Sequence, residues 1–158
     1  MLQLKVILGV LVALTIASAS EVPREVNICD VTRLAGQLDG KVVRVRGLLR
    51  NSDTSEDPSF DELVPEGCSN QEGSQTVIHI VSPDTHFLSH PPQGYKPDMN
   101  SVRRAEPIFK KAAADGKPVL GTVEGVFHAM RREIAVPPRH KQYSASIVIQ
   151  ALRGASEH

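Results

Sequence analysis

Hydrophobic and polar residues alternate along residues 41–50, and this alternation predicts a strand with one buried face. The hydrophobic face carries Val43, Val45, Gly47 and Leu49. The opposite face carries Arg44, Arg46 and Arg50. The glycine inside the strand permits a bulge or a sharp bend, because it has no Cβ atom to clash with a neighbouring chain.

The same kind of pattern predicts four further strands and two helices. The strands are residues 60–64, 76–81, 118–129 and 143–152. A short helix is predicted over residues 31–38, directly after Asp30, which is a capping residue. A longer helix is predicted over residues 102–114, where hydrophobic side chains recur at helical spacing before Gly116. Residues 153–158 are expected to be frayed.

The order of these elements is helix, three strands, helix and two strands. Five strands with a helix between the third and the fourth is the order of the OB-fold barrel. A first strand that bends at a glycine suits such a barrel, since that strand serves both halves of the sheet. The sequence therefore predicts a mainly β, α+β protein: a five-stranded OB-fold-like barrel with a short N-terminal helix and a helix between strands 3 and 4. The alternative is a generic small α+β or β-sandwich domain.

The first residues have the pattern of a secretory signal peptide. Lys5 precedes an almost wholly apolar stretch over residues 6–16, and the small-residue sequence Ala17-Ser18-Ala19 follows. We expect residues 1–19 to be removed and residues 20–158 to form a single OB-like domain of an exported protein, periplasmic or secreted. The alternative is an uncleaved membrane anchor, but the apolar stretch is shorter than the ~20 residues that cross a bilayer.

Export gives a role to the two cysteines, Cys29 and Cys68. In an oxidising compartment a disulfide between them is the default, and two cysteines allow only one intramolecular pairing. The alternative is a redox-active or nucleophilic cysteine. The chain has no C-x-x-C motif, and neither cysteine has a histidine close to it in sequence. The sequence therefore predicts a structural disulfide.

Several segments together resemble a group of small exported bacterial proteins with OB-like barrels, most of which have no assigned function. The matching segments are Cys29-Asp30-Val31, residues 39–47, Cys68, residues 123–127 and residues 143–150. They are structural in kind: a helix start, strands and a cysteine pair. The resemblance implies export and the barrel, and it implies no activity.

Composition and charge narrow the possible partners. The chain has 18 basic and 18 acidic residues, no tryptophan and 4% aromatic residues. A broad nucleic-acid-binding surface needs an excess of Lys and Arg together with stacking aromatics, so we expect no nucleic-acid partner. We expect no such partner even though Arg44, Arg46 and Arg50 share a strand face. The neutral total hides an acidic first half and a basic second half of the mature chain.

Two predicted loops carry much of this charge difference. The loop after the first strand carries Asp53, Glu56 and Asp57. The loop before the last strand carries Arg131, Arg132, Arg139, His140 and Lys141. These two loops flank one binding face in an OB barrel, so Arg131, Arg132, Arg139 and Lys141 are candidate ligand-binding residues in a two-signed cleft for a zwitterionic or protein ligand. The alternative is that the loops only pair with each other, which would contribute little stability.

The histidines offer less specific chemistry. His86 and His90 are four residues apart and are weak candidates for metal ligands, but no H-E-x-x-H context accompanies them. His79 lies between Ile78 and Ile80 and is predicted to be an exposed strand residue without a catalytic partner. No G-x-S-x-G or phosphate-binding motif occurs.

The sequence thus favours an exported, non-catalytic binding or interaction module. Its ligand would be a protein or a small molecule, with no cofactor and no membrane contact after signal cleavage. The alternative function is an extracytoplasmic hydrolase or metal-binding protein that uses the proline-rich loop over residues 82–100.

Overall fold

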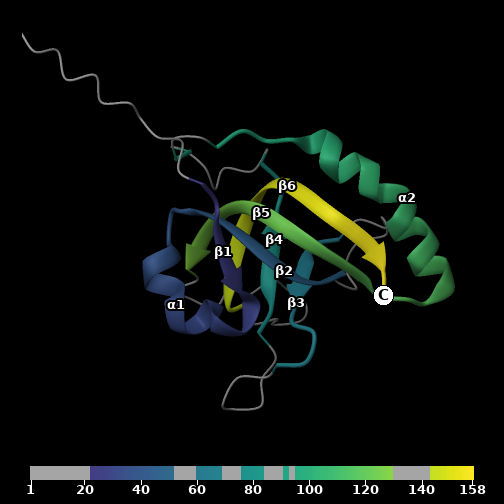
Figure 1. Cartoon of the computed structure of the whole chain (residues 1–158), viewed down its shortest axis with the longest axis horizontal. Helices are drawn as coiled ribbons and strands as arrows, with labels where there is room; N and C mark the ends of the chain where they lie inside the picture. The colour runs from purple at the N-terminus through teal and green to yellow at the C-terminus, as the bar shows by residue number, and fades with distance from the viewer. Residues whose placement is uncertain (1–21, 52–59, 69–75, 84–90, 93–94, 130–142) are drawn as a thin grey trace, which may run out of the picture.

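The computed structural model describes residues 22–51, 60–68, 76–83, 91–92, 95–129 and 143–158. The strands in this part of the chain are β1 (Arg24–Asn27), β2 (Val42–Arg50), β3 (Glu62–Val64), β4 (Ile78–Val81), β5 (Val119–Ala129) and β6 (Ala145–Glu157). The helices are the 3₁₀ turn η1 (Ile28–Asp30), α1 (Val31–Leu38) and α2 (Met99–Asp115). Figure 1 shows the long strands β5 and β6 curving across the molecule, with α1 and α2 on opposite sides.

Five of the strands close into a barrel. The sheet order is β1-β2-β3-β4-β6-β5, and β5 pairs again with β2. The pairs in the ring are antiparallel except β4 with β6, where Ile80 lies opposite Ile147 in parallel. This closure, together with α2 between β4 and β5, confirms the predicted OB-fold-like barrel and its two helices.

Two features of the sheet were not predicted. β1 adds a sixth strand that runs parallel to the first half of β2, with Val26 opposite Val45. The C-terminal segment is not frayed, because β6 continues to Glu157, which pairs with Val119 of β5. Lys111 and Lys117 form ion pairs with Glu157, so charge as well as the sheet holds this end of the chain.

Two glycines allow strands to approach more closely than a side chain would permit. Gly47 lies where β2 changes its neighbour from β1 to β3, and a Cβ atom there would be 2.6 Å from the carbonyl oxygen of Val64. Gly125 lies at a register shift between β5 and β6, where a Cβ atom would be 2.2 Å from the carbonyl oxygen of Val148. Gly47, the predicted bend site, is therefore a place of close packing, and Gly125 combines close packing with a shift of strand register.

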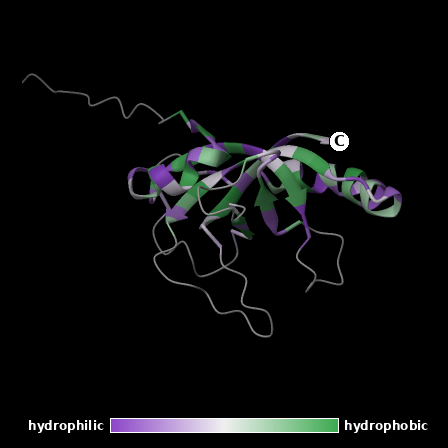
Figure 2. Cartoon of the chain, turned by 90° about the horizontal axis from the view of Figure 1, so that it is seen from below, coloured by the Kyte–Doolittle hydropathy of each residue, from purple (hydrophilic) through white to green (hydrophobic). Residues whose placement is uncertain are grey.

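The core fills the barrel and continues under both helices. Its fully buried members include Leu38 of α1, Val43 and Val45 of β2, Val123 and Phe127 of β5, and Ile147 of β6. Along the strands and around α2 the colouring of Figure 2 changes between hydrophobic and hydrophilic residues, as expected for elements with one buried face.

α1 has the predicted bounds, although the Asp30 side chain makes no capping hydrogen bond, and α2 begins three residues before the predicted start at residue 102. The Asp98 side chain accepts a hydrogen bond from the backbone N–H of Ser101 at the start of α2, and Gly116 ends the helix in the left-handed conformation. Phe109 of α2 stacks on Phe60, which precedes β3, with ring centroids 4.6 Å apart. None of the helices in the described segments is long and apolar enough to cross a membrane.

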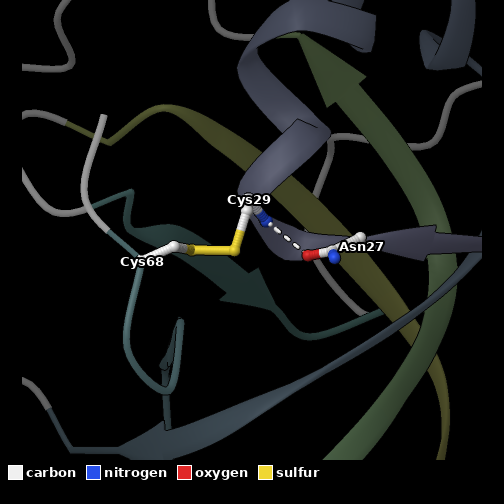
Figure 3. The surroundings of a disulfide bond; sticks show 3 residues. All are labelled: Asn27, Cys29 and Cys68. Atoms are coloured by element: carbon white, nitrogen blue, oxygen red, sulfur yellow. Dashed lines mark hydrogen bonds between the residues drawn. A yellow bond between two sulfur atoms is a disulfide. The ribbon is translucent and has the colours of Figure 1, made fainter. Parts of the chain in front are cut away.

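The predicted disulfide is present. Cys29 of η1 is bonded to Cys68, four residues after the end of β3, and their Cα atoms are 6.0 Å apart. Figure 3 shows how the turn at Cys29 is held: the Asn27 side-chain oxygen accepts a hydrogen bond from the backbone N–H of Cys29, at 2.9 Å. The bond thus fixes β1, η1 and the start of α1 to the β3 side of the barrel.

Replacing both cysteines by serine should destabilise the oxidised protein by about 4 kcal/mol, because the bond closes a loop with a sequence separation of 39. Urea unfolding followed by circular dichroism measures the change. An unfolding free energy equal to that of the wild type would show that the bond does not constrain the chain.

The substitution Gly125→Ala should destabilise the protein by at least ~2 kcal/mol, because the new methyl group collides with backbone that the sheet holds in place. Gly36→Ala is the matched control: Gly36 is exposed in α1 with no atom within 4 Å of the position of a Cβ atom. The control should gain up to ~1 kcal/mol from helix propensity. Equal melting temperatures for the two variants would contradict the close approach at Gly125.

Candidate functional site

OB barrels bind ligands on the outer face of their second and third strands, between the loop that joins strands 1 and 2 and the loop that joins strands 4 and 5. In this chain the two strands are β3 and β4. The two loops contain residues 52–59 and 130–142, which lie outside the described residues. The side chains on this outer face therefore define the candidate site.

Four polar side chains form one row across this face, which we call the polar row: Glu62, His79, Ser146 and His128. The strand register aligns them, since Glu62 is opposite His79, His79 is opposite Ser146, and Ser146 is opposite His128. The adjacent residues Leu63, Ile78 and Ile147 point into the core, so alternation turns the polar row outward. Side chains opposite one another on one face of a sheet are close enough to interact.

Tyr143 covers the Glu62–His79 end of the polar row. Its ring stacks on that of His79, with centroids 4.7 Å apart and planes inclined by 21°. Its hydroxyl donates a hydrogen bond to Glu62 Oε1 at 3.3 Å. The next residue, Ser144, donates its backbone N–H to the carbonyl of Val77. Tyr143 directly follows the loop over residues 130–142, which we call the basic loop, and it contacts both β3 and β4.

Burial is the main cause of the pKa shifts of His79 and Tyr143. It lowers the pKa of His79 below its ordinary 6.5, although the negative charges of Asp61 and Glu62 act in the opposite direction. Burial, the charges of Glu62 and Asp61, and the hydrogen bond to Glu62 raise the pKa of Tyr143 to about 12. At pH 7 both rings are therefore neutral. They form an aromatic surface beside the carboxylate of Glu62, which is only 5% exposed.

The other end of the polar row holds two buried polar atoms, Ser146 Oγ and His128 Nε2, with no hydrogen-bond partner among the described residues. Ser146 is 1% exposed, so its hydroxyl does not face solvent as a nucleophile would. No group of three or more metal-ligating side chains comes together in the described part of the chain. His79, His128 and Tyr143 are partly exposed, so these are the side chains that a ligand on this face would contact.

Arg131, Arg132, Arg139 and Lys141 lie outside the described residues, as do His86 and His90. The predicted site and the weak metal candidates therefore stay predictions.

The interpretation of His79 as an exposed residue is wrong: it faces away from the core, as predicted, but is half-buried against Tyr143. Sequence reasoning missed Glu62 and Tyr143 as its partners. The strand alternation gave the direction of His79, but only the register of β3 on β4 brings Glu62 to it.

Comparison with known proteins found no relative: no family model, curated protein or solved structure matched the chain. The resemblance to small exported bacterial proteins stays a prediction. The function has to be argued from the geometry of the site.

Two substitutions should move the pKa of His79 in opposite directions. Tyr143→Ala uncovers the imidazole and should raise its pKa toward 6.5, because burial is the main cause of the depression. Glu62→Gln removes a negative charge that favours the imidazolium and should lower the pKa further. NMR titration of the His79 ring protons measures both. Shifts in the same direction for the two variants would contradict the site as described.

Proposed function

We propose that the chain is an exported, non-catalytic binding module whose ligand contacts the outer face of β3 and β4. The observation that carries the proposal is the cluster of Glu62, His79 and Tyr143 on the face that OB barrels use. An aromatic pair beside a buried carboxylate is costly to assemble and adds little to the core, which favours a role in recognition.

The position of Tyr143 supports a ligand that carries both signs of charge. Tyr143 directly follows the basic loop, and Glu62 lies three residues after the loop over residues 52–59, which we call the acidic loop. Their hydrogen bond brings the bases of the two loops together on one face. A zwitterionic molecule or a protein surface with separated charges would pair with Arg131, Arg132, Arg139 and Lys141 on one side and the acidic loop on the other.

Export is supported by two independent features. Residues 1–19 have the composition of a cleavable signal peptide. The Cys29–Cys68 bond is of a kind that persists in oxidising compartments and is rare in the cytosol. We therefore place the protein in the periplasm or outside the cell, where its ligand would also be found.

Neutralising the basic loop tests the proposal. The variant with Arg131→Gln, Arg132→Gln, Arg139→Gln and Lys141→Gln should raise the dissociation constant for the captured ligand at least about tenfold. The immobilised protein is exposed to an extracellular extract of the producing organism, the captured component is purified, and its affinity is measured by calorimetry.

The control removes the same charge from the exposed face of α2, with Arg103→Gln, Arg104→Gln, Lys110→Gln and Lys111→Gln. This control should bind like the wild type, and Tyr143→Phe should weaken binding because it loses the bond to Glu62. An equal loss in both charge variants would reduce the effect to net charge and refute the site. Stoichiometric zinc in the purified protein would instead support the alternative, a hydrolase or metal-binding protein that uses residues 82–100.

A further inference from the structure

A cleft of about 650 Å³ lies on the outer side of β1, β2 and β5, away from the polar row. Its lining residues come from all three strands, from η1 and from the segment after β3. The charged and polar residues among them include Glu25, Asn27, Arg44, Arg46, Glu66 and Thr122. Its volume lies within the range of small-molecule sites.

Hydrogen-bond donors line up across the floor of this cleft. Asn27 is opposite Arg46, and Arg46 is opposite Thr122, so the three side chains occupy one row on the outer face of three adjacent strands. The Asn27 side-chain oxygen is already used by the N–H of Cys29, which orients the amide and leaves its two N–H donors for another partner (Figure 3). An amide, a guanidinium and a hydroxyl are thus presented together.

Most of the charges around the cleft are already paired. Arg44 donates two hydrogen bonds to Glu124 Oε2, at 3.1 and 2.8 Å, and the side chain of Glu124 is only 4% exposed. Arg44 also contacts Glu25 at 3.4 Å, and Glu66 Oε1 lies 2.7 Å from His158 Nε2. Glu124 additionally accepts a bond from Arg153, so two guanidinium groups share one buried carboxylate.

Arg46 differs from these residues. It is exposed and has no ion pair or hydrogen-bond partner among the described residues. Arg44 stands beside it on the same strand face, with its guanidinium fixed by Glu124. The cleft therefore holds one unpaired positive charge, a second cation nearby and two neutral donors.

We propose that this cleft is a second ligand site, which binds a small oxyanion, the carboxylate or phosphate group of a metabolite. The anion pairs with Arg46 and accepts hydrogen bonds from Asn27 or Thr122. The carboxylates of Glu25 and Glu66 at the cleft favour a single anionic group over a polyanion such as a nucleic acid, which would meet repulsion there.

The test is an NMR titration of the ¹⁵N-labelled protein with inorganic phosphate and, separately, with acetate at constant ionic strength. Saturable shifts are expected for the backbone amides of residues 27–29, 44–47 and 120–122. Saturation by phosphate alone identifies a phosphate group as the ligand chemistry, and saturation by acetate alone identifies a carboxylate. Saturation by neither, or shifts that sodium chloride reproduces, would overturn the proposal.

Matched variants separate binding from charge. Asn27→Asp retains an oxygen for the Cys29 N–H but loses the amide donors and adds a negative charge, so it should raise the dissociation constant about tenfold without loss of the turn. Arg46→Gln should have at least the same effect. Arg103→Gln on α2 removes the same charge elsewhere and should leave the affinity unchanged. Unchanged affinity in Arg46→Gln, with the fold intact by its amide spectrum, would also overturn the proposal.

Discussion

The whole architecture depends on the double use of strand β2. One of its edges pairs with β5 from Val42 to Leu49, while its other edge pairs first with β1 and then with β3. Such a strand must bend, and β3 must come close to Gly47, where a side chain would collide with the backbone of Val64. Closure of the barrel then follows through the parallel pairing of β4 with β6.

This closure assembles the two proposed binding faces from residues that are far apart in sequence. The polar row contains one residue from each of β3, β4, β6 and β5. The hydrogen-bond donors in the cleft, Asn27, Arg46 and Thr122, come from β1, β2 and β5. Glu124 and Arg44, 80 residues apart, form an ion pair between β5 and β2 at the cleft, in which Glu124 is buried and Arg44 is partly exposed. Burial of the Glu124 charge does not by itself favour folding, and its pairing with Arg44 offsets that cost and fixes the guanidinium.

The barrel could be predicted from the sequence because its elements have local signals: alternation in β2, β-branched residues in β4, and in α2 a helical spacing of hydrophobic residues before a glycine. The disulfide could be predicted because only one pairing is possible. β1 could not, since its four residues include a single buried one, Val26. The length of β6 was missed because residues 153–157 do not alternate regularly. Their order comes from pairing with β5 and from the ion pairs of Glu157 with Lys111 and Lys117. The site was only half predictable, as the direction of His79 is local but its contact with Glu62 depends on register.

Amide hydrogen exchange across the seam between β4 and β6 tests the central claim, closure of the barrel, most directly. If the seam is closed, the backbone amides of β4 and of the first half of β6 exchange as slowly as those in the middle of β2 and β5, because all of them open only with the whole barrel. Fast exchange in β4 alone, with β2 and β5 protected, would show an open sheet. It would also contradict the assembly of both the polar row and the Glu62–His79–Tyr143 cluster.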